Sequence, residues 1–273
     1  MTLSQRLSER LAAHGLQANK ALGQHFLLDL NVTRKIARLS GAAEGDHVIE
    51  VGPGPGGLTQ ALLETGARVT AVERDGRFLP LLEDLGEAFP GQLTIVHADA
   101  LKVDEAELAG PAGARIVSNL PYNVGTQLLV KWLTGPFRPR SMTLMFQKEV
   151  ASRIVAGPGA QDYGRLSVLV AALAEGRLVL EAPARAFTPP PKVDSAVVHL
   201  TPRNDAISGP RLEALQTVTA AAFGQRRKML RAGLKALGGE GLCQSAGVDP
   251  SARPETIGLE GFLRLADALL TKA

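Results

Sequence analysis

The chain has 273 residues, of which 45% are hydrophobic and 21% are charged, and its formal net charge is +3. This composition indicates a globular protein with a substantial core, and the charge permits an anionic partner. The only cysteine, Cys243, excludes an internal disulfide, and no apolar run approaches the ~20 residues that cross a bilayer. The N-terminus has no signal-peptide core, so we expect a cytoplasmic protein without a membrane segment.

The N-terminal region is expected to contain two helices separated by a loop. Leucines at four-residue spacing predict an amphipathic helix over residues 3–13. Residues 19–27 show no period, which predicts a loop. A second helix follows, with Asp29 or Asn31 as its N-cap and a stop at Gly41.

From residue 47 onward, short apolar strands alternate with helices. Strands are expected at 47–51, 68–72, 93–96, 115–117 and 141–146, with helices at 58–63, 124–133 and 148–155. Each strand ends in a polar or glycine-rich element. The alternation predicts a doubly wound α/β fold, a parallel sheet with helices on both faces, in which ligands bind beyond the carboxyl ends of the strands.

The remainder of the chain indicates a change of architecture near residue 203. The sheet region is expected to finish with a helix at 164–174, a strand at 177–181, a polyproline II connector at 187–192 and a strand at 194–200. Gly, Asn, Ser and Pro then cluster as in a linker. The helices predicted beyond it, at 211–222, 226–237 and about 255–270, form a small all-α domain. We therefore expect two domains, 1–203 and 204–273.

The glycine-rich turn at residues 52–57 predicts a nucleotide-containing ligand. Glycines let the backbone approach a ligand closely, and the following helix N-terminus offers free N–H groups. Glu73, about twenty residues beyond the first glycine, stands where a carboxylate accepts hydrogen bonds from ribose hydroxyls. The pattern fits both the G-x-G-x-x-G loop of NAD enzymes and the looser E-x-G-x-G loop of methyltransferases that use S-adenosylmethionine. The turn alone does not decide between these cofactors.

Polar groups after the next two strands favour S-adenosylmethionine. Asp99 can accept a hydrogen bond from an adenine amino group, although an Asp there also fits a helix N-cap. Asn119, Pro121 and Tyr122 supply an amide, a stiff turn and a flat stacking face, which suit a planar heterocycle with an exocyclic amino group. On their own, they also fit an ordinary strand-to-helix turn. No Lys, Tyr or His is evident for hydride transfer, which disfavours an NAD-dependent oxidoreductase.

Six ordered motifs resemble those of the KsgA family of small-subunit ribosomal RNA adenine dimethyltransferases. The resemblance runs from about Lys20 to Leu200 and extends into residues 223–230. The motifs are Gln24-His25-Phe26-Leu27, the 50–59 stretch Glu-Val-Gly-Pro-Gly-Pro-Gly-Gly-Leu-Thr, Glu73-Arg74-Asp75, Asp99-Ala100, Asn119-Leu120-Pro121-Tyr122-Asn123 and the 187–195 stretch Phe-Thr-Pro-Pro-Pro-Lys-Val-Asp-Ser. One departure is His25, where the family usually has Asn.

This resemblance implies a fold, an activity and a partner. The fold is a Rossmann-like methyltransferase sheet with a small all-α C-terminal domain. The activity is transfer of methyl groups from S-adenosylmethionine to N6 of two adjacent adenines near the 3′ end of small-subunit rRNA, with a role in subunit biogenesis. The protein would be a monomer that acts on small-subunit rRNA or on the small ribosomal subunit. It would need no metal.

The resemblance also assigns site residues. The target adenine would lie between Tyr122 and Phe187, with its N6 hydrogens donated to the side chain of Asn119 and to the backbone carbonyl of Leu120 or Pro121. The residues that bind the cofactor would be His25, Leu27, Gly52, Gly54, Glu73, Asp99, Ala100 and Asn119.

A basic cluster on the predicted 226–237 helix is a candidate RNA contact. It consists of Arg226, Arg227, Lys228, Arg231 and Lys235. As a bare charge run it also fits a solvated helix surface, but the family motif just before it favours phosphate contact.

Two rival functions share many of these features. A large-subunit rRNA dimethyltransferase of the antibiotic-resistance type has a similar cofactor loop and catalytic motif, but Leu120 and the form of the 187–193 connector favour the small-subunit enzyme. A non-catalytic RNA-binding assembly or transcription factor would retain the fold. The intact Glu73, Asn119, Pro121 and Tyr122 disfavour it.

Overall fold

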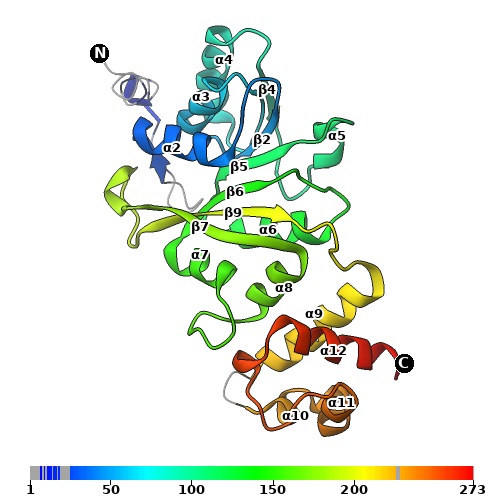
Figure 1. Ribbon diagram of the computed structural model, residues 1–273. Helices are drawn as coiled ribbons and strands as arrows, with labels where there is room; N and C mark the ends of the chain where they lie inside the picture. Colours follow the sequence, from blue (N-terminus) through cyan, green and yellow to red (C-terminus); the bar gives the residue numbers. More distant parts are fainter. Residues whose placement is uncertain are drawn as a thin grey trace. The chain divides into compact units, whose positions relative to one another are not determined.

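The computed structural model describes residues 7, 9, 11–13, 15–16, 18, 25–225 and 228–272 (Figure 1). The chain divides into two compact units. One comprises Met1–Ala151 and Arg177–Pro202, and the other comprises Ser152–Gly176 and Arg203–Ala273. Part of the predicted N-terminal helix, residues 19–24 of the predicted loop, and Arg226 and Arg227 lie outside the described residues.

A seven-stranded sheet with the order β4-β3-β2-β5-β6-β9-β7 forms the centre of the first unit and can be followed in Figure 1. The strands are β2 (His47–Val51), β3 (Arg68–Glu73), β4 (Leu93–His97), β5 (Arg115–Asn119), β6 (Met142–Gln147), β7 (Ala174–Ala182) and β9 (Ser195–Pro202). All seven predicted strands are confirmed, with small shifts of their ends. The prediction of a parallel sheet holds for β2 to β6 only, because β9 pairs antiparallel with β6.

The inner strands β2, β3, β5 and β6 are mostly buried because helices cover the sheet. Val48 and Ile49 of β2 are fully buried, as expected for parallel strands whose two faces are both covered. The helices of this part of the chain are α2 (Leu30–Ser40), α3 (Gly57–Leu63), α4 (Leu79–Ala88), α5 (Glu105–Ala109), α6 (Gly125–Thr134) and α7 (Lys148–Val155). Asp29 caps α2 as predicted, and Gly41 ends it with a φ of 69°.

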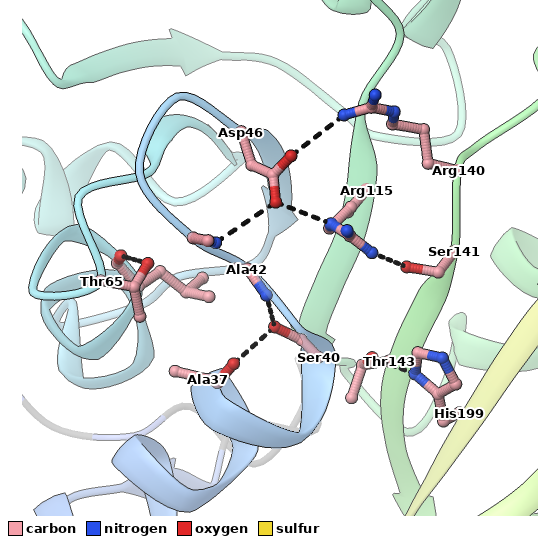
Figure 2. Close-up of polar contacts among 12 residues, drawn as sticks. Ala37, Ser40, Ala42, Asp46, Thr65, Arg115, Arg140, Ser141, Thr143 and His199 are labelled. Carbon is pink, nitrogen blue, oxygen red and sulfur yellow. Dashed lines mark hydrogen bonds and ion pairs between the residues drawn. The ribbon is translucent and has the colours of Figure 1, made fainter.

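A polar network joins the beginnings of three parallel strands, at the amino-terminal end of the sheet (Figure 2). The Asp46 carboxylate accepts hydrogen bonds from Arg115 (3.1 Å) and Arg140 (3.0 Å), and Arg115 also donates to the Ser141 hydroxyl at 3.0 Å. The network links the segments that enter β2, β5 and β6. Structural contacts therefore occupy the amino-terminal end of the sheet, and a ligand site is expected at the carboxyl ends of the strands.

A small antiparallel pair lies outside the main sheet. It consists of β1 (Phe26–Leu27) and β8 (Phe187–Thr188), with Leu27 opposite Phe187. The loop prediction was therefore wrong for residues 26–27, and the polyproline II prediction was wrong for residues 187–188. Their backbones pair with each other across a long sequence separation, which local patterns do not reveal.

The second unit is mainly helical. Its helices are α8 (Arg165–Leu173), α9 (Gly209–Phe223), α10 (Leu230–Gly233), α11 (Gly239–Ser245) and α12 (Leu259–Leu270). The single helix predicted at 226–237 was wrong, since α10 is short and a separate 3₁₀ turn follows at Lys235–Leu237. The amides of Leu230 and Arg231 instead donate to the carbonyls of Ala252 and Pro250. In the described part of the chain, every helix is too short or too polar to traverse a bilayer.

Candidate active site

A pocket opens at the carboxyl ends of β2, β3 and β5, the place that the doubly wound fold predicts for a ligand. Four segments contribute to its wall: residues 25–27, the turn after β2, the turn after β3 and the segment after β5. The lining residues are His25, Phe26, Leu27, Glu50, Gly52, Pro53, Gly54, Pro55, Gly57, Leu58, Glu73, Arg74, Asp75, Asn119, Leu120, Pro121, Tyr122, Asn123 and Val124.

The turn between β2 and α3 has a backbone that requires glycine. Gly52, Gly54 and Gly56 have φ values of 67°, 53° and 89°, in the left-handed region that side chains disfavour. A Cβ at Gly57 would lie 2.8 Å from the Leu27 carbonyl oxygen, too close for any other residue. The turn therefore presents bare backbone to the pocket, next to the N-terminus of α3.

Glu73 ends β3 inside the pocket and is fixed by two backbone amides. Its Oε2 accepts from the Gly54 amide at 2.9 Å, and its Oε1 accepts from the Asp75 amide at 2.7 Å. Burial raises the pKa of this carboxyl, while those amide bonds oppose the rise. Each carboxylate oxygen retains a further lone pair with which it can accept from a ligand hydroxyl.

Glu50 is a second buried acid in the pocket wall, which sequence analysis identified only as part of the glycine motif. It is 1% exposed, and its Oε2 has no hydrogen-bond partner among the described residues. Burial raises the pKa of Glu50 to about 8, and the neighbouring Glu73 adds to the rise. The carboxyl is therefore mainly protonated at neutral pH and can donate or accept a hydrogen bond.

The segment after β5 places an amide and two carbonyls at the pocket. Asn119 lies at the end of β5, and its Nδ2 is 3.5 Å from the His25 carbonyl. The Pro121 carbonyl already accepts from the amides of Val124 and Gly125 at the start of α6. Of the two predicted backbone acceptors, Leu120 is consequently the better candidate.

Tyr122 is fixed by a hydrogen bond at its hydroxyl and by a stacked ring on its face. Its hydroxyl lies 2.7 Å from the fully buried Ser195 hydroxyl, and the His25 ring stacks on its ring with centroids 5.5 Å apart. His25 Nδ1 in turn lies 2.9 Å from the Pro189 carbonyl, and because a carbonyl only accepts, Nδ1 carries the proton in this contact. Burial raises the pKa of Tyr122, so the phenol stays neutral at physiological pH.

Three of the residues predicted to bind the cofactor or the target adenine do not line this pocket. Asp99 accepts from the Leu101 amide at 3.1 Å and lies 3.7 Å from Arg74, which does line it; Ala100 follows Asp99. Phe187 is 2% exposed and packs in the aliphatic core with Leu27. In this structure the ring that stacks on Tyr122 is that of His25, and the clamp of Tyr122 and Phe187 around a target adenine stays a prediction.

Some pocket features had weak or no sequence signals. Ser195 and Arg74 fall inside recognised motifs, but nothing in their spacing showed that Ser195 holds Tyr122 and that Arg74 contacts Asp99.

In the second unit, the predicted RNA-binding residues Lys228 and Arg231 are exposed. Arg226 and Arg227 lie outside the described residues.

Comparisons with known proteins give one consistent result. The model of the family described as "Ribosomal RNA adenine dimethylase" matches residues 15–270. The chain is 66% identical to ribosomal RNA small subunit methyltransferase A of Phenylobacterium zucineum, over 97% of this chain and 93% of that protein. It is also 66% identical to the protein of the same name from Caulobacter vibrioides, over 93% and 98% of the two chains.

Two solved structures resemble the chain over most of their length. A dimethyladenosine transferase from Plasmodium falciparum has a TM-score of 0.72 at 25% identity, covering 86% of this chain and 94% of that one. The 23S rRNA methyltransferase ErmE has a TM-score of 0.69 at 28% identity, covering 89% and 99%.

Proposed function

Because the chain belongs to the ribosomal RNA adenine dimethylase family, we propose that it dimethylates N6 of two adjacent adenines near the 3′ end of small-subunit rRNA. Family membership makes it an rRNA adenine dimethyltransferase. The choice of the small subunit rests on the 66% identity, over nearly the whole chain, with enzymes named ribosomal RNA small subunit methyltransferase A. Dimethylation would then take part in small-subunit biogenesis.

The pocket fits S-adenosylmethionine as the methyl donor. The bare backbone of the 52–57 turn admits a close ligand, Glu73 can accept from ribose hydroxyls, and Glu50 offers an unpartnered buried carboxyl oxygen. When bound, S-adenosylmethionine supplies an electrophilic methyl group. Asp99 and Ala100 would contact the adenine of the cofactor. They do not line the pocket themselves, but Asp99 lies beside Arg74, which does. The remaining cofactor contacts that we propose are His25, Leu27, Gly52, Gly54 and Asn119.

The segment after β5 would bind and activate the target adenine. The Asn119 side-chain oxygen and the Leu120 carbonyl would accept the two N6 hydrogens, which draws the nitrogen lone pair out of ring conjugation. Tyr122 would provide the stacking face. Most of the rate enhancement would then come from alignment and charge stabilisation, because the methylated nitrogen can release its proton to water.

Contact with the RNA outside the pocket is assigned to the C-terminal region beyond residue 203. Lys228 and Arg231 are exposed there, next in the chain to Arg226 and Arg227. Their positive charges suit the phosphates of a structured RNA whose adenine has been unstacked. The partner is therefore small-subunit rRNA or the small ribosomal subunit, and we propose that the enzyme acts as a monomer.

Large-subunit rRNA is the main competing substrate, since ErmE shares the fold. The deciding experiment supplies tritiated S-adenosylmethionine with small-subunit and large-subunit particles from a strain lacking this protein. We expect label in two adjacent adenines near the 3′ end of the small-subunit RNA and none in the large-subunit RNA. Label confined to the large subunit, or to neither, would overturn the proposal.

Two variants test the assignment of roles within the pocket. Asn119→Ala should lower kcat about 10²- to 10³-fold, because the target base loses an acceptor, while S-adenosylhomocysteine still binds through its other proposed contacts. Glu73→Ala should instead raise the Kd for S-adenosylhomocysteine about tenfold or more. Unchanged turnover in both variants would remove the site assignment.

A further inference from the structure

The ammonium group of Lys131, on α6, is surrounded by one short loop. Its Nζ lies 2.8 Å from the Ala100 carbonyl, 2.5 Å from the Val103 carbonyl and 2.8 Å from Glu105 Oε1. A lysine ammonium has three N–H donors, so these contacts account for all of them. The segment from Ala100 to Glu105, which leads into α5, thus folds around a cation supplied by α6.

The carboxylate in this cluster is buried and doubly held. Glu105 is 3% exposed, and its Oε1 also accepts from the Trp132 indole N–H at 2.7 Å. Lys131 and Trp132 are consecutive residues of α6, so the same helix contributes both donors. Loss of the cation would leave a buried negative charge without its partner, which is strongly unfavourable.

The loop that Lys131 holds begins directly after Asp99. The Asp99 side chain accepts from the Leu101 amide, and its backbone carbonyl accepts from the Lys102 amide at 2.8 Å. Asp99 also lies 3.7 Å from Arg74 of the pocket wall. The turn that carries Asp99 is thus compact, and Lys131 fixes it at residues 100 and 103.

Helix α6 also fixes the segment proposed to bind the target adenine. At its beginning, the amides of Val124 and Gly125 both bond to the Pro121 carbonyl, which immediately follows Asn119 and Leu120. Lys131 lies six residues beyond Gly125, a distance of about 9 Å along the helix. One helix therefore holds the catalytic segment at its start and the Asp99 turn further along.

We propose that Lys131 is a positioning residue that sets the Asp99 turn against the catalytic segment and thereby makes the cofactor site selective for adenine. It touches neither cofactor nor substrate and acts through Asp99. This inference rests on the proposed function, because it assumes that Asp99 accepts from the adenine amino group of the cofactor.

The test compares two ligands that differ in the group facing Asp99. Lys131→Met keeps most of the side-chain stem and removes the charge. Calorimetry would give the Kd for S-adenosylhomocysteine and for S-inosylhomocysteine, in which an oxygen replaces the amino group. We expect about a tenfold loss of affinity for the adenine ligand and little change for the inosine ligand. An equal loss for both ligands, or no loss, would overturn the proposal.

A matched control is Lys148→Met. Lys148 forms an exposed ion pair with Glu181 at 2.8 Å, so this variant loses the same charge away from the Asp99 turn. It should retain the selectivity of the wild-type protein. If Lys131→Met does not fold, Lys131→Gln is measured in the same way, since its amide can still donate two hydrogen bonds.

A double-mutant cycle separates this role from general destabilisation. In an Asp99→Asn background, Lys131→Met should change the Kd for S-adenosylhomocysteine less than about threefold, because the residue through which Lys131 acts is already altered. Fully additive losses would refute the inference. If the wild-type protein bound neither ligand, the proposed function itself would fail; if the Lys131→Met variant bound and discriminated as strongly as the wild-type protein, only this inference would.

Discussion

The imidazole ring of His25 stacks on the phenol ring of Tyr122, with centroids 5.5 Å apart and ring planes inclined by 30°. This separation is that of one direct ring stack and leaves no space for a third ring between them. His25 therefore covers one face of Tyr122. A target adenine that uses this face must displace the imidazole, and the Pro189 carbonyl then loses its hydrogen bond with Nδ1.

Replacing His25 should consequently help RNA to enter. We expect His25→Ala to lower the KM for the RNA about 2- to 10-fold, which corresponds to the free energy of one aromatic pair. His25→Asn, which installs the residue usual in the family, should act in the same direction. The Kd for S-adenosylhomocysteine, measured in parallel, separates any effect on the cofactor. A raised RNA KM with unchanged cofactor binding would show that His25 forms part of the base site.

The main sheet and the glycine turn were predictable because their signals are local. The parallel strands contain short runs rich in valine and isoleucine, such as Val48-Ile49 and Ile116-Val117, and the turn needs glycine at positions such as Gly52 and Gly54. Helix α4 and the short helix α5 were not predicted. The signal for α4 was present, since Leu81, Leu82 and Leu85 recur at helical spacing and form its buried face. Helix α5 has only five residues and begins at the Asp104 cap, which accepts from the Ala106 and Glu107 amides.

The inner arrangement of the pocket could not be predicted in the same way. Tyr122 and Ser195 are 73 residues apart, and His25 and Pro189 are 164 apart. Such contacts depend on tertiary folding, so the motifs identified the segments that form the pocket but not which of their side chains are in contact. Phe187 illustrates the limit, because its motif gave no sign that the ring packs in the core with Leu27, and its place beside the target base stays a prediction.

The Ser195 hydroxyl should determine the orientation of Tyr122. Ser195→Ala and Tyr122→Phe each remove the same 2.7 Å hydrogen bond. We expect each variant to raise the RNA KM severalfold with little effect on cofactor binding, and the double variant to be no worse than the more severe single one. Steady-state kinetics on all four proteins tests this. Additive losses would mean that the two hydroxyls act independently.

The exposed basic residues of the C-terminal region should contribute to RNA affinity through charge. Lys228→Glu combined with Arg231→Glu should weaken RNA binding and reduce the slope of log K against log salt by about one for each phosphate interaction removed. Cofactor affinity should not change. The control is Lys35→Glu with Arg38→Glu, which reverses the same number of charges on exposed positions of α2. Equal losses in both double variants would indicate a general effect of net charge.

The proton on Glu50 should make the stability of the protein depend on pH. Burial raises its pKa from an ordinary value of 4.5 to about 8, so the folded protein retains a proton that the unfolded chain releases in this interval. The contribution of this proton to stability is complete below pH 4.5 and is lost as the pH rises through 8. The Tm of Glu50→Gln, in which residue 50 is neutral at every pH, should therefore rise relative to that of the wild type as the pH increases from 5 to 9.

Glu64→Gln is a control with the opposite sign. Arg34 lowers the pKa of Glu64, so this variant should lose a little stability at neutral pH and none in acid. A Tm difference between Glu50→Gln and wild type that does not vary with pH in calorimetry would show that Glu50 is ionised in the folded protein.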